Sequence, residues 1–150
     1  MGQDAKRRRL DIIELTEQLI AIPSISGNET EILHFVASWM QSVNFDKVIT
    51  EKRFTTGLIR ASKQPAQRAL ILCGHVDTVS PGDKSAWQQS PWQPYVADGR
   101  LYGLGATDMK AGVALQMIAA AEYANKRRDD LDVWCVAVAS EEVDGAGSAD

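Results

Sequence analysis

One apolar stretch of the chain is followed by a histidine and an aspartate that are two residues apart in sequence. His75 and Asp77 come directly after residues 69–73, a continuous apolar run. Residues two apart on an extended segment point to the same side, so these two side chains can act together. His75 can bind a metal ion while Asp77 fixes the orientation of its imidazole ring. A buried hydrogen bond between them, with no metal, remains the alternative on this triplet alone.

Two adjacent glutamates, Glu141 and Glu142, follow a second apolar run at residues 133–139. Carboxylates so close to a buried strand are costly to desolvate unless a cation or a proton compensates their charge. Neighbouring side chains on an extended segment diverge, so we expect one glutamate to bind metal and the other to transfer protons. A solvated acidic loop is the alternative.

A glycine-containing segment, residues 102–110, lies between these two clusters. Its glycines suggest a nucleotide-binding loop, but the third glycine of a dinucleotide loop is absent and no Gly-Lys-Ser/Thr ending follows. A phosphate site is therefore the weaker alternative. We expect the loop to deliver Asp108 to the start of a helix. One carboxylate can bridge two cations, which is a common hydrolytic arrangement.

The elements that must position these groups are predicted from hydrophobic spacing. A first helix is expected over residues 10–22, ended by Pro23. Ser26 followed by Glu29 matches a capping box at the start of a second helix, in which His34 is expected to have a structural role. Strands are expected near residues 47–52 and 57–61.

The second half of the chain predicts a hairpin, a helix and a buried strand. Asp98-Gly99 lies between two short strand-like segments and is a strong turn signal. A long helix is expected over about residues 109–126, and a strand over residues 133–139. The tryptophans at positions 87 and 92 are expected to pack over the sheet.

These elements predict an α/β fold in which helices pack on both faces of a mixed, mostly parallel sheet. The fully apolar runs at residues 69–73 and 133–139 are typical of strands covered on both faces. In such folds ligand sites form at the carboxyl ends of the strands, where both runs here end in polar residues. A length of 150 residues is enough for one domain.

Composition narrows the classes of function. The chain is 45% hydrophobic and 24% charged, which indicates a globular protein, and its net charge of −4 gives no reason to expect a nucleic-acid partner. The basic cluster at residues 6–9 is interpreted as a solvated segment. No stretch is apolar and long enough to cross a membrane. Cys73 and Cys135 are expected to be reduced core residues, which favours the cytoplasm.

Together the three clusters resemble one metallopeptidase family, which includes acetylornithine deacetylase, succinyl-diaminopimelate desuccinylase, aminoacylase and glutamate carboxypeptidase. The resemblance extends from about Leu10 onward. Three motifs carry it in order: Gly74-His75-Val76-Asp77-Thr78-Val79, Gly105-Ala106-Thr107-Asp108-Met109-Lys110, and Glu141-Glu142.

The resemblance implies a role for each of these residues. His75 would bind one metal ion, Glu142 the other, and Asp108 would bridge both. Asp77 would orient His75, and Glu141 would be the general base. Two divalent metal ions, Zn²⁺ or Co²⁺, would serve cleavage of an amide bond in an N-acyl amino acid or a small peptide. The resemblance also implies a cis peptide after Asp108.

The resemblance further implies parts that these 150 residues do not contain. Two more metal ligands, a domain that encloses substrate and helps to form a homodimer, and the rest of the catalytic sheet are expected in a longer protein. We therefore expect residues 1–150 to be the N-terminal portion of a catalytic domain. An inactive chain that keeps the fold, and a dipeptidase or carboxypeptidase of the same family, remain the alternatives.

Overall fold

A computed structural model describes residues 11–148, and the basic cluster at residues 6–9 lies outside them. The helices are α1 (Ile12–Ala21), α2 (Thr30–Ser42) and α3 (Ala111–Tyr123). The strands are β1 (Lys47–Thr50), β2 (Phe54–Ile59), β3 (Arg68–His75), β4 (Tyr95–Ala97), β5 (Arg100–Tyr102) and β6 (Leu131–Val138). Short helical turns are η1 (Lys84–Ala86), η2 (Ala106–Lys110) and η3 (Ala146–Ser148). Every helix and strand expected from the sequence is present, with ends shifted by a few residues.

The main sheet has the strand order β1-β2-β6-β3. Strands β3 and β6 are parallel and in register from Arg68 opposite Leu131 to His75 opposite Val138. The β1–β2 and β2–β6 pairs are antiparallel. The predicted mixed sheet of an α/β fold is confirmed. Within the described residues, however, only the β3–β6 pair is parallel, so this part of the sheet is not mostly parallel.

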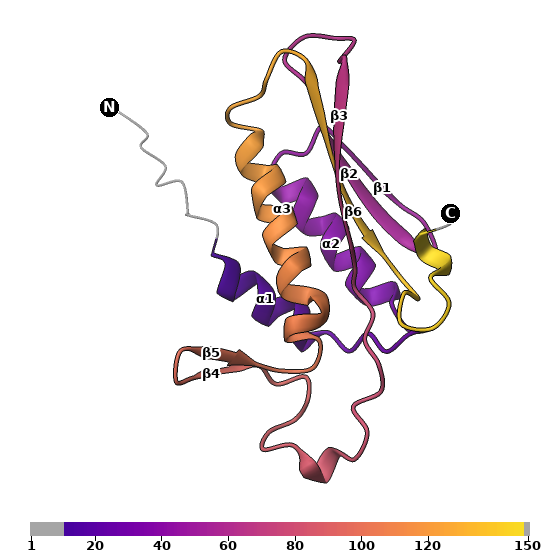
Figure 1. The fold of residues 1–150 in the computed structure, drawn as a ribbon, viewed down its shortest axis with the longest axis vertical. Coiled ribbons are helices and arrows are strands. Elements are labelled where there is room, and N and C mark those ends of the chain that lie inside the picture. Colours follow the sequence, from indigo (N-terminus) through magenta and orange to yellow (C-terminus); the bar gives the residue numbers. More distant parts are fainter. Residues whose placement is uncertain (1–10, 149–150) are drawn as a thin grey trace.

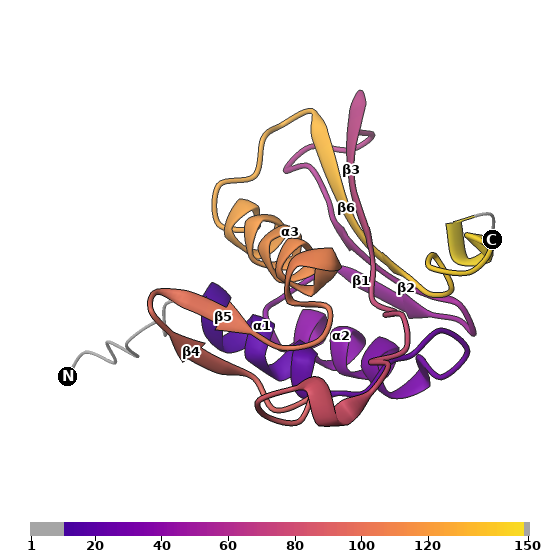
Figure 2. The same ribbon diagram turned by 60° about the horizontal axis from the view of Figure 1, so that its bottom comes forward.

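All three helices lie on one face of this sheet (Figures 1 and 2). The buried side chains of β6 alternate along the strand, at Val133, Cys135 and Ala137, as expected when one face is covered. They pack with apolar residues of the helices, among them Leu19, Leu33, Val36, Met40, Val113 and Met117. The expectation of helices on both faces is not met in the described part of the chain.

Strand β3 is the edge strand of the sheet and is largely exposed. Leu70 is 45% exposed and Ile71 64% exposed, and Cys73 is exposed as well. The prediction that residues 69–73 are covered on both faces is therefore wrong in the described structure. The prediction that Cys73 lies in the core is wrong as well. Cys135 is buried as predicted, and both cysteines are free. An apolar run indicates that a strand can be buried, but burial also requires residues from other segments to pack against it.

The start of α2 differs from the expected capping box. The residue before α2 is Glu29, and no side chain caps the helix, whereas Asp11 caps α1 by accepting from the backbone N–H groups of Ile13 and Glu14. Ser26 contacts β3 instead of the helix, through Asp77. The prediction of a capping box was wrong because both of its side chains have partners elsewhere.

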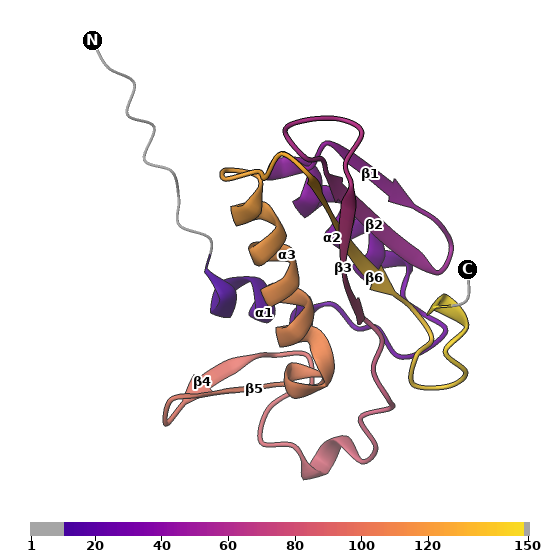
Figure 3. The ribbon, with the colours of Figure 1, turned by 45° about the horizontal axis from the view of Figure 1, so that its top comes forward.

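The hairpin of β4 and β5 is confirmed, with positive φ at Asp98 (50°) and Gly99 (72°). Figure 3 shows that the hairpin and the loop containing η1 lie beyond the end of α3, away from the four-stranded sheet. Trp87 of this loop donates to the Pro81 carbonyl and Lys84 lies over the Trp92 ring, and neither tryptophan is among the core residues between helices and sheet. Among the described residues, no helix has the length and apolarity that a membrane span needs.

Candidate metal centre

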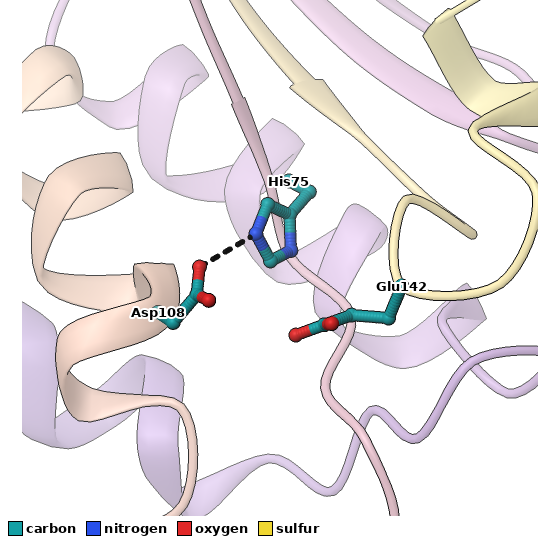
Figure 4. A group of neighbouring side chains, drawn as sticks. All are labelled: His75, Asp108 and Glu142. Carbon is teal, nitrogen blue, oxygen red and sulfur yellow. Dashed lines mark hydrogen bonds and ion pairs between the residues drawn. The ribbon is translucent and has the colours of Figure 1, made fainter.

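The parallel pairing of β3 and β6 brings the two polar clusters to one edge of the sheet. His75 ends β3 and is aligned with Val138, which ends β6. The chain after β6 turns at once, so Glu142 comes back toward His75, while Asp108 approaches from the turn η2 that precedes α3 (Figure 4). Three segments far apart in sequence thus meet at the carboxyl ends of the parallel strands, where α/β folds bind ligands.

One ligand atom each from His75, Asp108 and Glu142 lies within 4.8 Å of the other two. Nε2 of His75 is 3.0 Å from Oδ1 of Asp108. The side chain of His75 is buried, that of Asp108 is exposed and that of Glu142 is partly exposed. The two carboxylates therefore lie on the side of the group that faces solvent. The structure brings together the three residues that were predicted to bind metal. By contrast, His34 lies exposed on α2 and is not part of this group.

The hydrogen bonding of His75 indicates which nitrogen is available for a cation. Its Nδ1 lies 3.2 Å from the backbone carbonyl oxygen of Asp77. A carbonyl oxygen only accepts, so Nδ1 carries the hydrogen, and in the neutral ring Nε2 has a free lone pair. That lone pair faces Asp108 Oδ1, which is another acceptor. Two acceptors 3.0 Å apart repel each other unless a metal ion or a proton lies between them.

Asp77 is fully buried and contacts both clusters. Its Oδ1 is 3.5 Å from His75 Nδ1 and accepts from the backbone N–H of Glu141, at 3.1 Å. Its Oδ2 accepts from the N–H of Glu142, at 3.1 Å, and from the hydroxyl of Ser26, at 2.7 Å. A buried carboxylate needs such donors to offset its lost hydration. Asp77 therefore joins the end of β3 to the turn after β6.

The two glutamates face the centre differently. Glu142 belongs to the group of three ligand atoms, whereas Glu141 is half-exposed and its Oε2 lies 3.8 Å from Nε2 of His75. Partial burial raises the pKa of Glu142, and the negative charge of Asp108 raises it further. The gathering of carboxylates is thus electrostatically unfavourable without a cation.

The turn that carries Asp108 depends on Gly105. Gly105 has φ +76°, and a Cβ there would lie 2.6 Å from the Thr78 side chain. Its carbonyl accepts from the N–H of Lys110, which closes a turn in which Asp108 has non-helical backbone angles. The Asp108–Met109 peptide is cis, as the resemblance implied. The glycine that suggested a phosphate loop therefore shapes a tight turn.

Lys110 is a buried cation that the sequence reasoning did not identify. It is 0% exposed, and its Nζ donates to the carbonyl oxygens of Leu19 and Ile22, each at 2.9 Å. These carbonyls lie at the C-terminal end of α1, where a cation is favourable. Burial lowers the pKa of Lys110 to about 8. A lone lysine at the start of an apolar helix was the only signal in the sequence.

A hollow of about 810 Å³ adjoins the centre. Asp108 and Glu142 line it on one side, and Trp87 and Tyr102 are among the residues that line the rest. The ring of Tyr102 stacks on Tyr95, with centroids 4.9 Å apart. The hollow is large enough for a small molecule placed beside the three candidate ligands.

The fold and the site together define a class of protein: an α/β domain with an imidazole and carboxylates gathered at the carboxyl edge of its parallel strands, the donor set of metal-dependent hydrolases. Comparison with known proteins gives the family. The chain belongs to peptidase family M20/M25/M40, whose sequence model matches residues 71–150.

The relatives agree in sequence and in structure. A succinyl-diaminopimelate desuccinylase of Cereibacter sphaeroides is 33% identical over 138 residues, which is 91% of this chain and 36% of the relative. An M20 family metallo-carboxypeptidase from Sulfolobus solfataricus superposes with a TM-score of 0.77 at 19% identity, over 89% of this chain and 31% of that one. A dinuclear metal-binding M20 peptidase of Bacillus subtilis gives a TM-score of 0.63 at 14% identity, over 88% and 35%. The chain therefore spans about a third of the length of these relatives.

Proposed function

We propose that the protein containing this chain is a metal-dependent hydrolase that cleaves an amide bond of an N-acyl amino acid or a small peptide. The observation that carries the proposal is the gathering of three ligand atoms: His75 Nε2 lies 3.0 Å from Asp108 Oδ1, and a Glu142 oxygen belongs to the same group. Membership of a peptidase family supports this choice of reaction.

The donor set fits divalent metal ions. One imidazole nitrogen and carboxylate oxygens are ligands that zinc accepts, and cobalt binds similar sites. In our proposal His75 and Asp108 hold one ion, Asp108 and Glu142 hold the second, and Asp108 is shared. Bound ions of this kind make water a stronger acid and stabilise negative charge on the substrate oxygen.

The chain's own residues would then move the proton and hold the geometry. Glu141 would accept a proton from the attacking water and pass it to the departing amine. Its half-exposed carboxylate, 3.8 Å from His75 Nε2, supports that role because it can reach a water beside the centre. Asp77 would hold the imidazole of His75 through its carbonyl group and its carboxylate. The hollow beside Asp108 would hold the substrate.

The length of the relatives supports a larger catalytic unit. The described residues provide three candidate ligands, whereas a zinc ion in a catalytic site usually has three protein ligands of its own. We infer that residues 1–150 form the N-terminal portion of a catalytic domain. A longer chain would supply the remaining ligands, the rest of the sheet, and a second domain that encloses substrate and forms a homodimer.

We place this protein in the cytoplasm.

The sequence relatives support the substrate class that we propose. The relatives at 33–37% identity are succinyl-diaminopimelate desuccinylases, which favours an N-acyl amino acid. Peptidases among the structural neighbours make a dipeptidase or carboxypeptidase the second candidate, supported by fold alone. An inactive chain that keeps the fold is the third.

The test combines metal analysis with hydrolysis assays. The longest natural chain that contains this sequence is purified, its zinc and cobalt are measured, and N-succinyl and N-acetyl amino acids are compared with dipeptides as substrates. We expect about two divalent ions per chain and faster cleavage of the N-acyl amino acids. A protein that binds no divalent ion would refute the proposal. Metal binding without turnover would favour the inactive alternative.

A further inference from the structure

The connection between α1 and α2 runs beside the chain that follows β3. Ile25 forms a parallel bridge with Thr78. The N–H of Thr78 donates to the Ser24 carbonyl at 2.9 Å, and the N–H of Ser26 donates to the Thr78 carbonyl at 3.2 Å. The hydroxyl of Ser24, which is fully buried, donates to the Val76 carbonyl at 2.7 Å. This connection is therefore hydrogen-bonded along residues 76–78, next to the candidate metal centre.

Ser26 takes part in the network around Asp77. Its hydroxyl donates to Oδ2 of Asp77 at 2.7 Å, and the same oxygen accepts from the N–H of Glu142. The other oxygen of Asp77 accepts from the N–H of Glu141. Ser26 thus fixes the rotation of the carboxylate that holds the backbone of both glutamates.

Glu29 holds the same turn from its other end. Its side chain is buried, and its Oε1 accepts from the N–H of Ser140 at 3.1 Å, from the hydroxyl of Ser140 at 3.3 Å, and from the N–H of Gly27 at 2.9 Å. Ser140 has φ +60°, a conformation that serine rarely adopts without support. Glu29 supplies that support where the chain leaves β6.

These contacts replace a cap that α2 does not have. Ser26 and Glu29 have the spacing of a capping box, which would stabilise the start of a helix. Both side chains instead face the ends of β3 and β6, at Asp77 and Ser140. Their hydrogen bonds are directed at the candidate centre rather than at the helix.

We propose that Ser26 and Glu29 are positioning residues that clamp the turn at residues 140–142 and thereby set the distance of Glu142 from His75 and Asp108. The proposal deepens the function proposed above and depends on it for the identity of the metal ligands. Neither residue touches substrate or metal in it. Each acts through the backbone of the turn, Ser26 by way of Asp77 and Glu29 by way of Ser140.

The experiment uses pairs of variants in the longest natural chain that contains this sequence. Ser26→Ala and Glu29→Ala remove the clamp, whereas Ser26→Thr keeps a hydroxyl and Glu29→Gln keeps an acceptor oxygen. Ser38→Ala and Glu31→Ala are matched controls, because both residues are exposed on α2. Co²⁺ affinity is measured from its visible absorption bands, and amide hydrogen exchange is measured at Glu141 and Glu142.

Both alanine variants are expected to bind Co²⁺ roughly 10-fold more weakly than the wild type, the usual effect of losing a residue that supports a metal ligand. Exchange at the two glutamate amides should quicken in the same variants. Ser26→Thr, Glu29→Gln and both controls should stay near wild type in both measurements. A merely stabilising role would change thermal unfolding without changing Co²⁺ affinity well below the melting temperature.

Two other outcomes are distinguishable. Alanine variants with wild-type Co²⁺ affinity and wild-type exchange at both amides would overturn the clamp. A wild type that binds no Co²⁺ would overturn the proposed function, and the exchange rates would still decide whether Ser26 and Glu29 hold the turn. If Glu29→Ala does not fold, the Ser26→Ala and Ser26→Thr pair decides the question.

Discussion

At the scale of single residues, the geometry of the candidate centre depends on hydrogen bonds made by side-chain atoms that do not themselves face the cation site. His75 presents Nε2 to Asp108 because its Nδ1 is engaged by the carbonyl of Asp77. Asp77 in turn has both carboxylate oxygens occupied by donors from Ser26, Glu141 and Glu142. The imidazole nitrogen that could bind a cation is thus oriented by Asp77, which is not itself one of the three candidate ligands.

The two glutamates provide a test at this scale, because their proposed roles differ. Glu141→Ala should reduce turnover roughly 10²–10⁴-fold, the usual contribution of a general base, while metal content stays near that of the wild type. Glu142→Ala should reduce both turnover and metal content, since it removes a ligand. Metal analysis and steady-state kinetics on the same preparations measure both quantities. If Glu141→Ala loses metal and Glu142→Ala keeps it, the two roles are reversed.

At the scale of elements, helix α1 is fastened to the turn that carries Asp108. The Lys110 ammonium group bonds to two carbonyls at the end of α1, and Pro23 follows that end directly. The backbone N–H of Lys110 also closes the turn around Asp108, by donating to the carbonyl of Gly105. The position of Asp108 therefore depends on a helix that contributes no side chain to the group of ligands.

This buried lysine makes stability depend on pH. Its pKa is about 8 in the folded protein, against 10.5 for an ordinary lysine, so between these values the unfolded chain keeps a proton that the folded chain has released. Raising the pH through this window therefore stabilises the fold, by up to about 1.4 kcal/mol per pH unit. Lys110→Met cannot titrate and should lack this gain.

Urea unfolding at pH 7.5 and pH 9.5 measures the effect. The free energy of unfolding of the wild type relative to Lys110→Met should increase with pH. Lys52→Met is the control, because Lys52 is exposed. If the free energies of unfolding of the wild type and Lys110→Met change by the same amount between the two pH values, burial does not shift the pKa of Lys110.

At the scale of the whole molecule, the described chain has one covered and one open sheet face. The helices cover the face that carries Val133 and Cys135 of β6, whereas Ile71 and Cys73 of β3 are exposed on the opposite face. Exposed apolar residues on an edge strand form a surface on which another segment of polypeptide can pack or pair. The succinyl-diaminopimelate desuccinylase relative is about two and a half times as long as this chain and has further residues that could do so.

The two cysteines report on this open face. In the 150-residue chain, iodoacetamide at pH 8 should modify Cys73 and leave Cys135 unmodified, because burial raises the pKa of Cys135 to about 12. Mass spectrometry of peptides before and after unfolding measures both sites. In a longer chain that covers β3, Cys73 should become protected. Equal labelling of both cysteines in the folded 150-residue chain would contradict the structure.

Much of this molecule could be predicted from its sequence, because the signals are local. Apolar periodicity and turn residues predicted each helix, each strand and the Asp98-Gly99 hairpin. The polar residues after two apolar runs and the glycine-containing loop indicated where a site would form, and the family resemblance implied His75, Asp108 and Glu142 as its ligands. The mixed α/β fold and the family followed from the same features. These properties depend on a few consecutive residues, whose spacing is visible in the sequence.

Other properties were decided only by the tertiary structure. Ser26 and Glu29 have the spacing of a helix cap, but their partners are Asp77 and Ser140, distant residues that the sequence does not identify. The apolar run in β3 indicated burial on both faces, yet burial requires covering segments, and the described residues cover this strand only in part. Hydrogen-bond choice and burial depend on which distant groups come within a few ångströms, so they are fixed only when the chain has folded.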